Sequence, residues 1–141
     1  DEVTEKLDEY RELVDEVRQE KNKIKLDIET LEGGLLEYFD ILDALNKAAE
    51  KIEDQEFINS VSVAIKTKDQ INDRLGIQLI PVDEGTAVDP EVHYIIKSTP
   101  TNTNKSDSTV NQVIQNGYRR GNRLLRKASV ISNAYEGEGN E

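Results

Sequence analysis

The chain contains no cysteine, methionine or tryptophan among its 141 residues, and only two phenylalanines and five tyrosines. Without cysteine there is neither a disulfide framework nor a thiolate metal site, which fits a reducing compartment. Aromatic side chains are too scarce to fill one thick core, and no hydrophobic run approaches a membrane span. Because the chain begins at Asp1 and lacks methionine, we expect it to be a processed or truncated piece of a longer protein.

The formal net charge of -11 is concentrated at one end of the chain. The first 56 residues carry 19 Asp and Glu against 8 Lys and Arg, whereas the remaining residues carry 10 of each kind. An acidic surface repels phosphate backbones and anionic lipids. We therefore expect no nucleic-acid partner and no membrane partner, and we interpret the acidic segment as a solvated helix.

Apolar residues recur at alternating intervals of four and three from Val3 to Ile52, which is the heptad pattern of a coiled coil. Lys21 is the one charged residue at a seam position. A helix of this length extends about 75 Å at about 1.5 Å per residue, so a small domain cannot cover its seam. The pattern predicts a homodimer. The predicted dimer contacts are Val14, Val17, Ile24, Ile28, Leu31, Leu35, Leu42 and Leu45.

Gly33 and Gly34 interrupt this helix with two residues of low helix propensity. The pair could form the turn of an antiparallel hairpin. However, the heptad phase continues from Leu31 to Leu35, and a turn would ordinarily reset it. We therefore favour a kink or a junction between two helical segments.

A second amphipathic helix is indicated from Phe57 to Leu75, with Gly76 as its C-terminal stop. Packed against residues 35–52, it would form a helical hairpin. Two such hairpins, one from each subunit, would form a four-helix bundle.

From Ile77 onward, β-branched residues alternate with turn residues. The predicted strands are 77–82, 93–99, 109–115 and 124–133, with a loop over 99–108. The fold class is therefore α+β, in which the helices precede a small, mostly antiparallel β-domain. We predict a coiled-coil stalk at 1–34, a helical dimerisation bundle at 35–76, the β-domain at 77–135 and a disordered tail at 136–141.

Two stretches of the β-region carry a family resemblance. They are Asp89-Pro90-Glu91-Val92-His93 and the run Gly117-Tyr118-Arg119-Arg120-Gly121-Asn122-Arg123-Leu124-Leu125-Arg126-Lys127-Ala128-Ser129-Val130. They resemble the two signature stretches of the GrpE family. Leu35-Leu36 followed by Asp40, Leu42 and Asp43 is also similar to that family in order and spacing, so the resemblance covers about residues 31–132.

The resemblance implies a parallel homodimer with a paired-helix stalk, a four-helix bundle and a β-domain on each side. It implies a co-chaperone that acts as an ADP exchange factor, whose partner is the ATPase domain of a DnaK-type chaperone. It implies no catalysis and no cofactor. The expected location is the cytoplasm or, alternatively, an organelle matrix such as the mitochondrial one.

Position by position, the resemblance places the chaperone-binding residues in the last motif. Arg123 is the expected contact residue, with an intradomain salt bridge as the alternative, and its guanidinium suits a carboxylate or carbonyl cluster. Asn122 and Arg126 belong to the same motif, although we expect Arg126 to support the domain more than to reach outward. Ser132 stands where relatives often have an apolar contact residue.

Three other kinds of protein could have such a sequence. An enzyme would need a nucleophile with a base, a phosphate-binding loop or a metal-spaced cluster, and none occurs. His93 is expected to be a hydrogen-bonded histidine of the domain, because it lacks companion metal ligands. A coiled-coil scaffold would not need the arginine-rich hairpin. A GrpE-like paralogue without exchange activity stays open, because Tyr10-Arg11-Glu12 in the stalk departs from the family pattern. Glu37 in the bundle departs from it as well.

Overall fold

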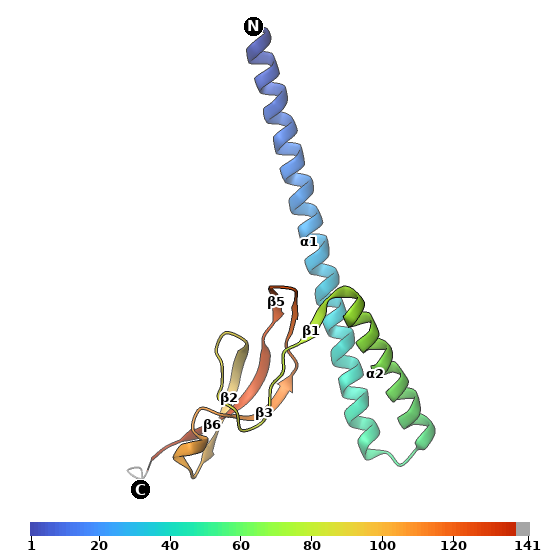
Figure 1. Ribbon diagram of the computed structural model, residues 1–141, viewed down its shortest axis with the longest axis vertical. Coiled ribbons are helices and arrows are strands. Elements are labelled where there is room, and N and C mark those ends of the chain that lie inside the picture. Colours follow the sequence, from blue (N-terminus) through green and yellow to red (C-terminus); the bar gives the residue numbers. More distant parts are fainter. Residues whose placement is uncertain (138–141) are drawn as a thin grey trace. The chain divides into compact units, whose positions relative to one another are not determined.

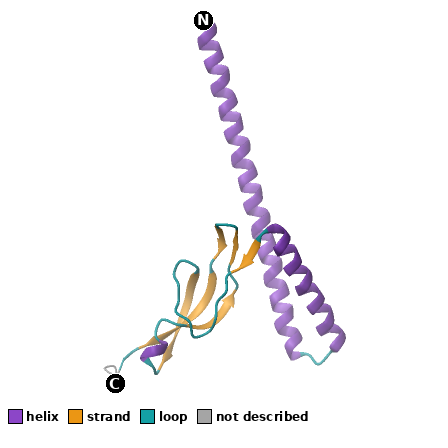
Figure 2. Ribbon diagram, viewed as in Figure 1, coloured by secondary structure: helices purple, strands orange, loops and turns teal. Residues whose placement is uncertain are grey.

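A computed structural model describes residues 1–137 and shows two helices followed by a small β-domain (Figures 1 and 2). The helices are α1 (Glu2–Lys51) and α2 (Gln55–Leu75). The remaining elements are β1 (Ile77–Leu79), β2 (His93–Thr101), the short helix η1 (Asn104–Ser106), β3 (Val110–Gln115), β4 (Tyr118–Arg120), β5 (Arg123–Arg126) and β6 (Ala128–Tyr135). The predicted α+β class is confirmed.

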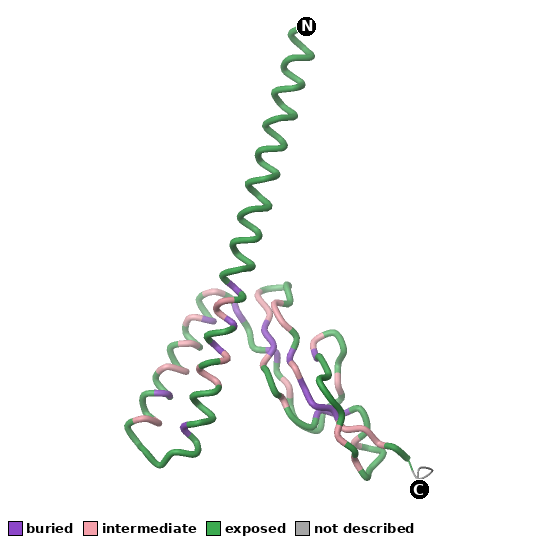
Figure 3. The backbone as a smooth tube through the Cα atoms, turned by 180° about the vertical axis from the view of Figure 1, so that it is seen from behind, coloured by how far each residue is buried: buried purple, intermediate pink, exposed green. Residues whose placement is uncertain are grey.

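Helix α1 is one uninterrupted helix through Gly33 and Gly34. The prediction of an antiparallel turn at this glycine pair, which stayed open in the sequence, is therefore wrong. The prediction of a junction between two separate helices is wrong as well. A Cβ added at either glycine would meet nothing within 4 Å. The chain divides into two compact units, residues 1–38 and 39–141. Within the first unit, every residue from 1 to 31 is exposed (Figure 3).

Helix α2 begins and ends with capping contacts. The Asp54 side chain accepts a hydrogen bond from the backbone N–H of Phe57 at 3.3 Å, which satisfies one of the free donors at the helix start. At the other end, Gly76 adopts the left-handed conformation with φ of 71°, and its N–H donates to the carbonyls of Asn72 and Asp73. The predicted stop at Gly76 is confirmed.

The strands form two three-stranded sheets, in the orders β1-β4-β5 and β2-β6-β3. Three of the strand pairings are antiparallel, and only β2 with β6 is parallel. The predicted strand 124–133 is in fact two strands, because β5 ends at Arg126 and β6 begins at Ala128. Strand β4 was not predicted. Two of its three residues are arginines, so the segment has no hydrophobic alternation from which a strand could be predicted.

The core of the second sheet consists of Val110, Ala128 and Val130, which are almost fully buried. Gly117 passes directly over the chain between β5 and β6, where an added Cβ would lie 2.8 Å from the carbonyl oxygen of Arg126. No side chain fits at that position.

Of the predicted tail, residues 138–141 lie outside the described part of the chain. Neither described helix is both long and apolar enough to cross a bilayer.

Candidate functional site

The arginine-rich motif folds into a hairpin of β4 and β5. Arg120 pairs with Arg123 at its tip, and Gly121 turns the chain with φ of 59°. Asn122 and Arg123 are both exposed there. The Arg120 Nε donates to the carbonyl oxygen of Leu75 at 3.0 Å, which ties the hairpin to the end of α2. The tip therefore places Asn122 and Arg123 at the surface of the domain.

Arg126 lies at the base of the hairpin, where its guanidinium is engaged inside the molecule. Its Nη1 and Nη2 donate to the two carboxylate oxygens of Asp40 at 2.9 and 2.8 Å. Its Nε and Nη2 also donate to the carbonyl oxygen of Asn116 at 3.0 and 2.6 Å. The Arg126 guanidinium thereby joins α1 to the β-domain, which is the supporting role expected for this residue.

Tyr118 packs against Phe39 of α1 on one side and near the Arg126 guanidinium. Its side chain is fully buried, with its ring centroid 5.4 Å from that of Phe39. The Arg126 guanidinium lies 5.6 Å from the same ring, a cation–π distance. Burial, together with the nearby Asp43 carboxylate, raises the pKa of Tyr118 to about 12. The hairpin is thus anchored to α1 by a buried aromatic contact beside its ion pair.

The residues of α1 that hold the hairpin lie off the heptad seam. Asp43 accepts hydrogen bonds from Asn116 at 2.9 Å and from Lys68 of α2 at 3.4 Å, and Asp40 also accepts one from Gln115. Asp40 and Asp43 stood out in the sequence only through the family resemblance. Their partners Gln115, at the end of β3, and Asn116, directly after it, could not be identified from the sequence, because nothing local to an exposed amide indicates a distant partner.

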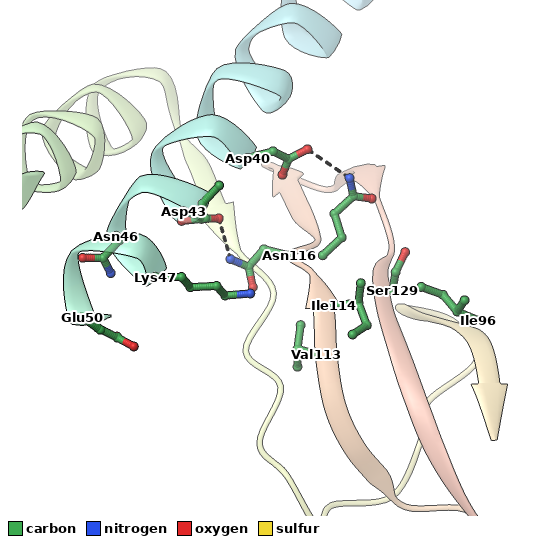
Figure 4. A pocket seen from close by; sticks show the side chains of 12 residues that line it. Asp40, Asp43, Asn46, Lys47, Glu50, Ile96, Val113, Ile114, Asn116 and Ser129 are labelled. Carbon is green, nitrogen blue, oxygen red and sulfur yellow. Dashed lines mark hydrogen bonds between the residues drawn. The ribbon is translucent and has the colours of Figure 1, made fainter. Parts of the chain in front are cut away.

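A groove of about 730 Å³ opens beside these contacts (Figure 4). Side chains of α1, including Lys47 and Glu50, form one wall. Ile96 and Ile114 of the sheet, half exposed, form an apolar floor. Within the described residues, no cluster of His, Cys, Asp and Glu is arranged to hold a metal ion.

Ser132 lies inside the second sheet. Its side chain is 4% exposed, and its hydroxyl oxygen is 2.9 Å from that of Ser98 across the parallel pair β2–β6. Unlike Asn122 and Arg123, it offers a partner almost no surface. A role of Ser132 in binding stays a prediction, and it would act mainly through the shape of the sheet.

The first signature stretch forms a hydrogen-bonded turn before β2. The backbone N–H of Asp89 donates to His93 Nδ1 at 2.9 Å, and the N–H of His93 donates to the carbonyl oxygen of Asp89 at 2.8 Å. The Asp89 carboxylate accepts from the N–H of Glu91 at 3.0 Å. His93 is buried, as expected for a hydrogen-bonded histidine of the domain.

The predicted dimer contacts lie along α1, most of them in its exposed part. Val14, Val17 and Ile24 are 54–60% exposed, and Leu31 is 69% exposed. Such large aliphatic side chains at heptad positions leave a continuous apolar stripe in water. The remaining predicted contacts are Ile28 and Leu45, about 40% exposed, and the half-buried Leu35 and Leu42.

Comparison with known proteins agrees with this arrangement. The chain is 28% identical over 113 residues to Protein GrpE of Natronomonas pharaonis, covering 80% of the chain and 51% of that relative. It is 30% identical over 123 residues to Protein GrpE of Thioalkalivibrio sulfidiphilus, covering 86% of the chain and 65% of the relative. Protein GrpE of Halorhodospira halophila is 33% identical over 114 residues, which cover 79% of the chain and 46% of the relative.

The chain thus spans about half to two thirds of the length of these curated relatives. The family model described as GrpE matches residues 1–133, which include the seam of α1, the turn at Asp89–His93 and the hairpin with Arg123. The resemblance in the two signature stretches therefore extends over nearly the whole chain, and this chain belongs to the GrpE family.

Proposed function

We propose that this chain is a co-chaperone that accelerates ADP release from a DnaK-type chaperone, without catalysing a reaction itself. The observation that carries the proposal is the exposed cationic tip of the β4–β5 hairpin, with Asn122 and Arg123, on a base anchored by Arg126 and Asp40. A rigid base reduces the conformational entropy lost when the tip binds a partner. Membership of the GrpE family supports the ATPase domain of such a chaperone as the partner.

The mechanism requires only differential binding. A protein that binds the open form of a nucleotide cleft more tightly than the closed form shifts the equilibrium toward opening, and ADP then leaves. Arg123 would contribute a charged hydrogen bond available only in the open complex.

The test is the release rate of a fluorescent ADP from a DnaK-type ATPase domain, measured by stopped flow. We expect strong acceleration by the wild-type chain. Arg123→Ala should weaken binding by about 1–3 kcal/mol, the usual cost of losing a charged hydrogen bond at a binding hot spot. Circular dichroism and sedimentation should show an unchanged fold, because the Arg123 side chain is exposed.

The matched control is Lys105→Ala, which removes another exposed cation of the same domain, away from the hairpin. It should leave the release rate unchanged. If both variants slow release equally, general charge attraction rather than the hairpin tip is responsible. If Arg123→Ala unfolds the domain, Arg123 is structural.

The alternative is a GrpE-like paralogue or scaffold that dimerises without promoting exchange. The specific observation in its favour is the stalk, where Tyr10-Arg11-Glu12 departs from the family pattern. A chain that is dimeric by sedimentation yet leaves ADP release unaccelerated would establish this alternative.

A further inference from the structure

The apolar stripe of α1 contains a single charged layer. Lys21 occupies the seam position between Val17 and Ile24, which are 60% and 56% exposed, and it is itself exposed. Every other seam position from Val3 to Ile52 is apolar. A lysine at such a position costs stability in a two-stranded coil but can specify register and oligomer state.

The heptad phase places two further charges around this layer. With Lys21 at position a, Glu20 is at g and Lys25 is at e. In a parallel pair in register, the g residue of one chain lies beside the following a residue of the other chain. It also lies opposite the e residue that is five positions further along. Glu20 would therefore lie between Lys21 and Lys25 of the partner subunit.

We propose that Lys21, with Glu20 as its cross-chain partner, fixes the parallel in-register pairing of a second copy of this chain along α1. The inference rests on the homodimer in the proposed function and adds the residue that aligns it. In register, both lysines share one layer, and each has an acidic neighbour from the opposite chain. A shift of one heptad would place a lysine in each of two layers, opposite Val14 or Ile28, and would disrupt both.

The other charges along the seam do not supply this alignment. In the parallel in-register pair, Lys6 would face Arg11, and this pair repels. Glu32, at the position opposite Asp27, is only 5% exposed within its own chain. Only Glu20 with Lys25 attracts. The layer at Lys21 is therefore the one place in the exposed part of α1 where polar contacts favour the aligned pair over a shifted one.

The absence of cysteine allows a direct test by disulfide crosslinking. Leu7 and Val14 are both at position a, so a cysteine at either one meets its own copy only in a parallel, aligned dimer. Chains with Leu7→Cys should crosslink to each other under mild oxidation. A mixture of Leu7→Cys and size-tagged Val14→Cys chains should give almost no mixed crosslink, because that product requires a one-heptad shift.

Adding Lys21→Ile to both chains should make the mixed crosslink appear. The same substitution should raise the melting temperature of the dimer by about 4 °C or more, because it replaces a charged layer with an apolar one. Lys23→Ile, an exposed lysine off the seam, is the matched control and should change neither measurement. Glu20→Gln should lower the melting temperature more when Lys21 is present than in Lys21→Ile, where only the attraction to Lys25 is lost.

A mixed crosslink that stays absent in Lys21→Ile would overturn the proposal, even if the melting temperature rises. The proposal would also be overturned if chains that keep Lys21 gave no crosslink between two Leu7→Cys chains. The same holds if they gave the mixed crosslink as readily as the crosslink between two Leu7→Cys chains. None of these measurements involves a chaperone. Failure of the alignment therefore leaves the exchange proposal untouched, and failure of ADP release leaves the alignment result standing.

Discussion

The exposed part of α1 and the β-domain differ in whether their own chain buries their apolar residues. From residue 1 to residue 31 every side chain is exposed, although valine, leucine and isoleucine recur at each heptad. In the β-domain, Val110, Tyr118, Ala128 and Val130 are almost fully buried by the same chain. In the proposed homodimer the first region would be half of an interface, whereas the second is a core that one chain completes.

This difference has a thermodynamic consequence. A surface that is buried only on association gains stability with protein concentration, whereas an intramolecular core does not. Substitutions in the β-domain should therefore act on each chain alone. Substitutions along the α1 stripe should act through the dimer, as in the test of Lys21.

Gly117→Ala should have the largest effect, and it tests the close packing of the β-domain. The new methyl group would collide with the backbone of Arg126, Lys127 and Ala128, which cannot shift as a flexible side chain can. We expect a loss of about 3 kcal/mol in the free energy of unfolding, the upper range for overpacking. Urea unfolding followed by tyrosine fluorescence measures it.

Gly33→Ala is the matched control in α1. An added Cβ there meets nothing within 4 Å, and alanine has the higher helix propensity, so helix stability should rise by about 1 kcal/mol. Equal effects of the two substitutions would contradict the contrast between the regions.

Arg126→Ala comes next, and it tests whether the hairpin base depends on α1. The substitution removes the guanidinium donors of the Asp40 carboxylate and of the Asn116 carbonyl, in a site where the two charged side chains are 21% and 30% exposed. Gln115 still donates to Asp40. We expect a loss of about 2 kcal/mol, between an exposed and a buried ion pair. Comparing Asp40→Asn, Arg126→Ala and the double variant by urea unfolding isolates the pair. Additive losses would show that the ion pair contributes nothing of its own.

The sequence was sufficient to predict the elements that have a periodic hydrophobic pattern or end at a glycine. The heptads of α1 continue across Gly33 and Gly34, and the helix does too, because an exposed glycine costs too little to end a helix stabilised on both sides. Gly76 was identifiable as a stop because a glycine after an amphipathic run commonly adopts the left-handed conformation.

The sequence was insufficient where side chains meet over a long separation. Arg126 and Asp40 are 86 positions apart, and nothing local to either residue indicates the other. The parallel pairing of β2 with β6 is similarly invisible, since strand alternation does not reveal direction. Ser132 was expected at a contact by resemblance alone, and only its depth in the sheet showed how little of it a partner could touch.

The smallest effect concerns the pH dependence of the β-domain through Tyr118. Its pKa is raised to about 12 because burial disfavours the phenolate, against an ordinary value of about 10 in the unfolded chain. Above about pH 10 the unfolded state therefore loses this proton first, and stability falls as pH rises toward 12. Tyr118→Phe removes that titration while keeping the ring beside Phe39. Urea unfolding at pH 9 and pH 11.5 should show the wild type losing more stability than the variant, since other titrating groups are common to both. Parallel losses would mean that the Tyr118 hydroxyl reaches water, and that the contact anchoring the hairpin is less dry than the geometry indicates.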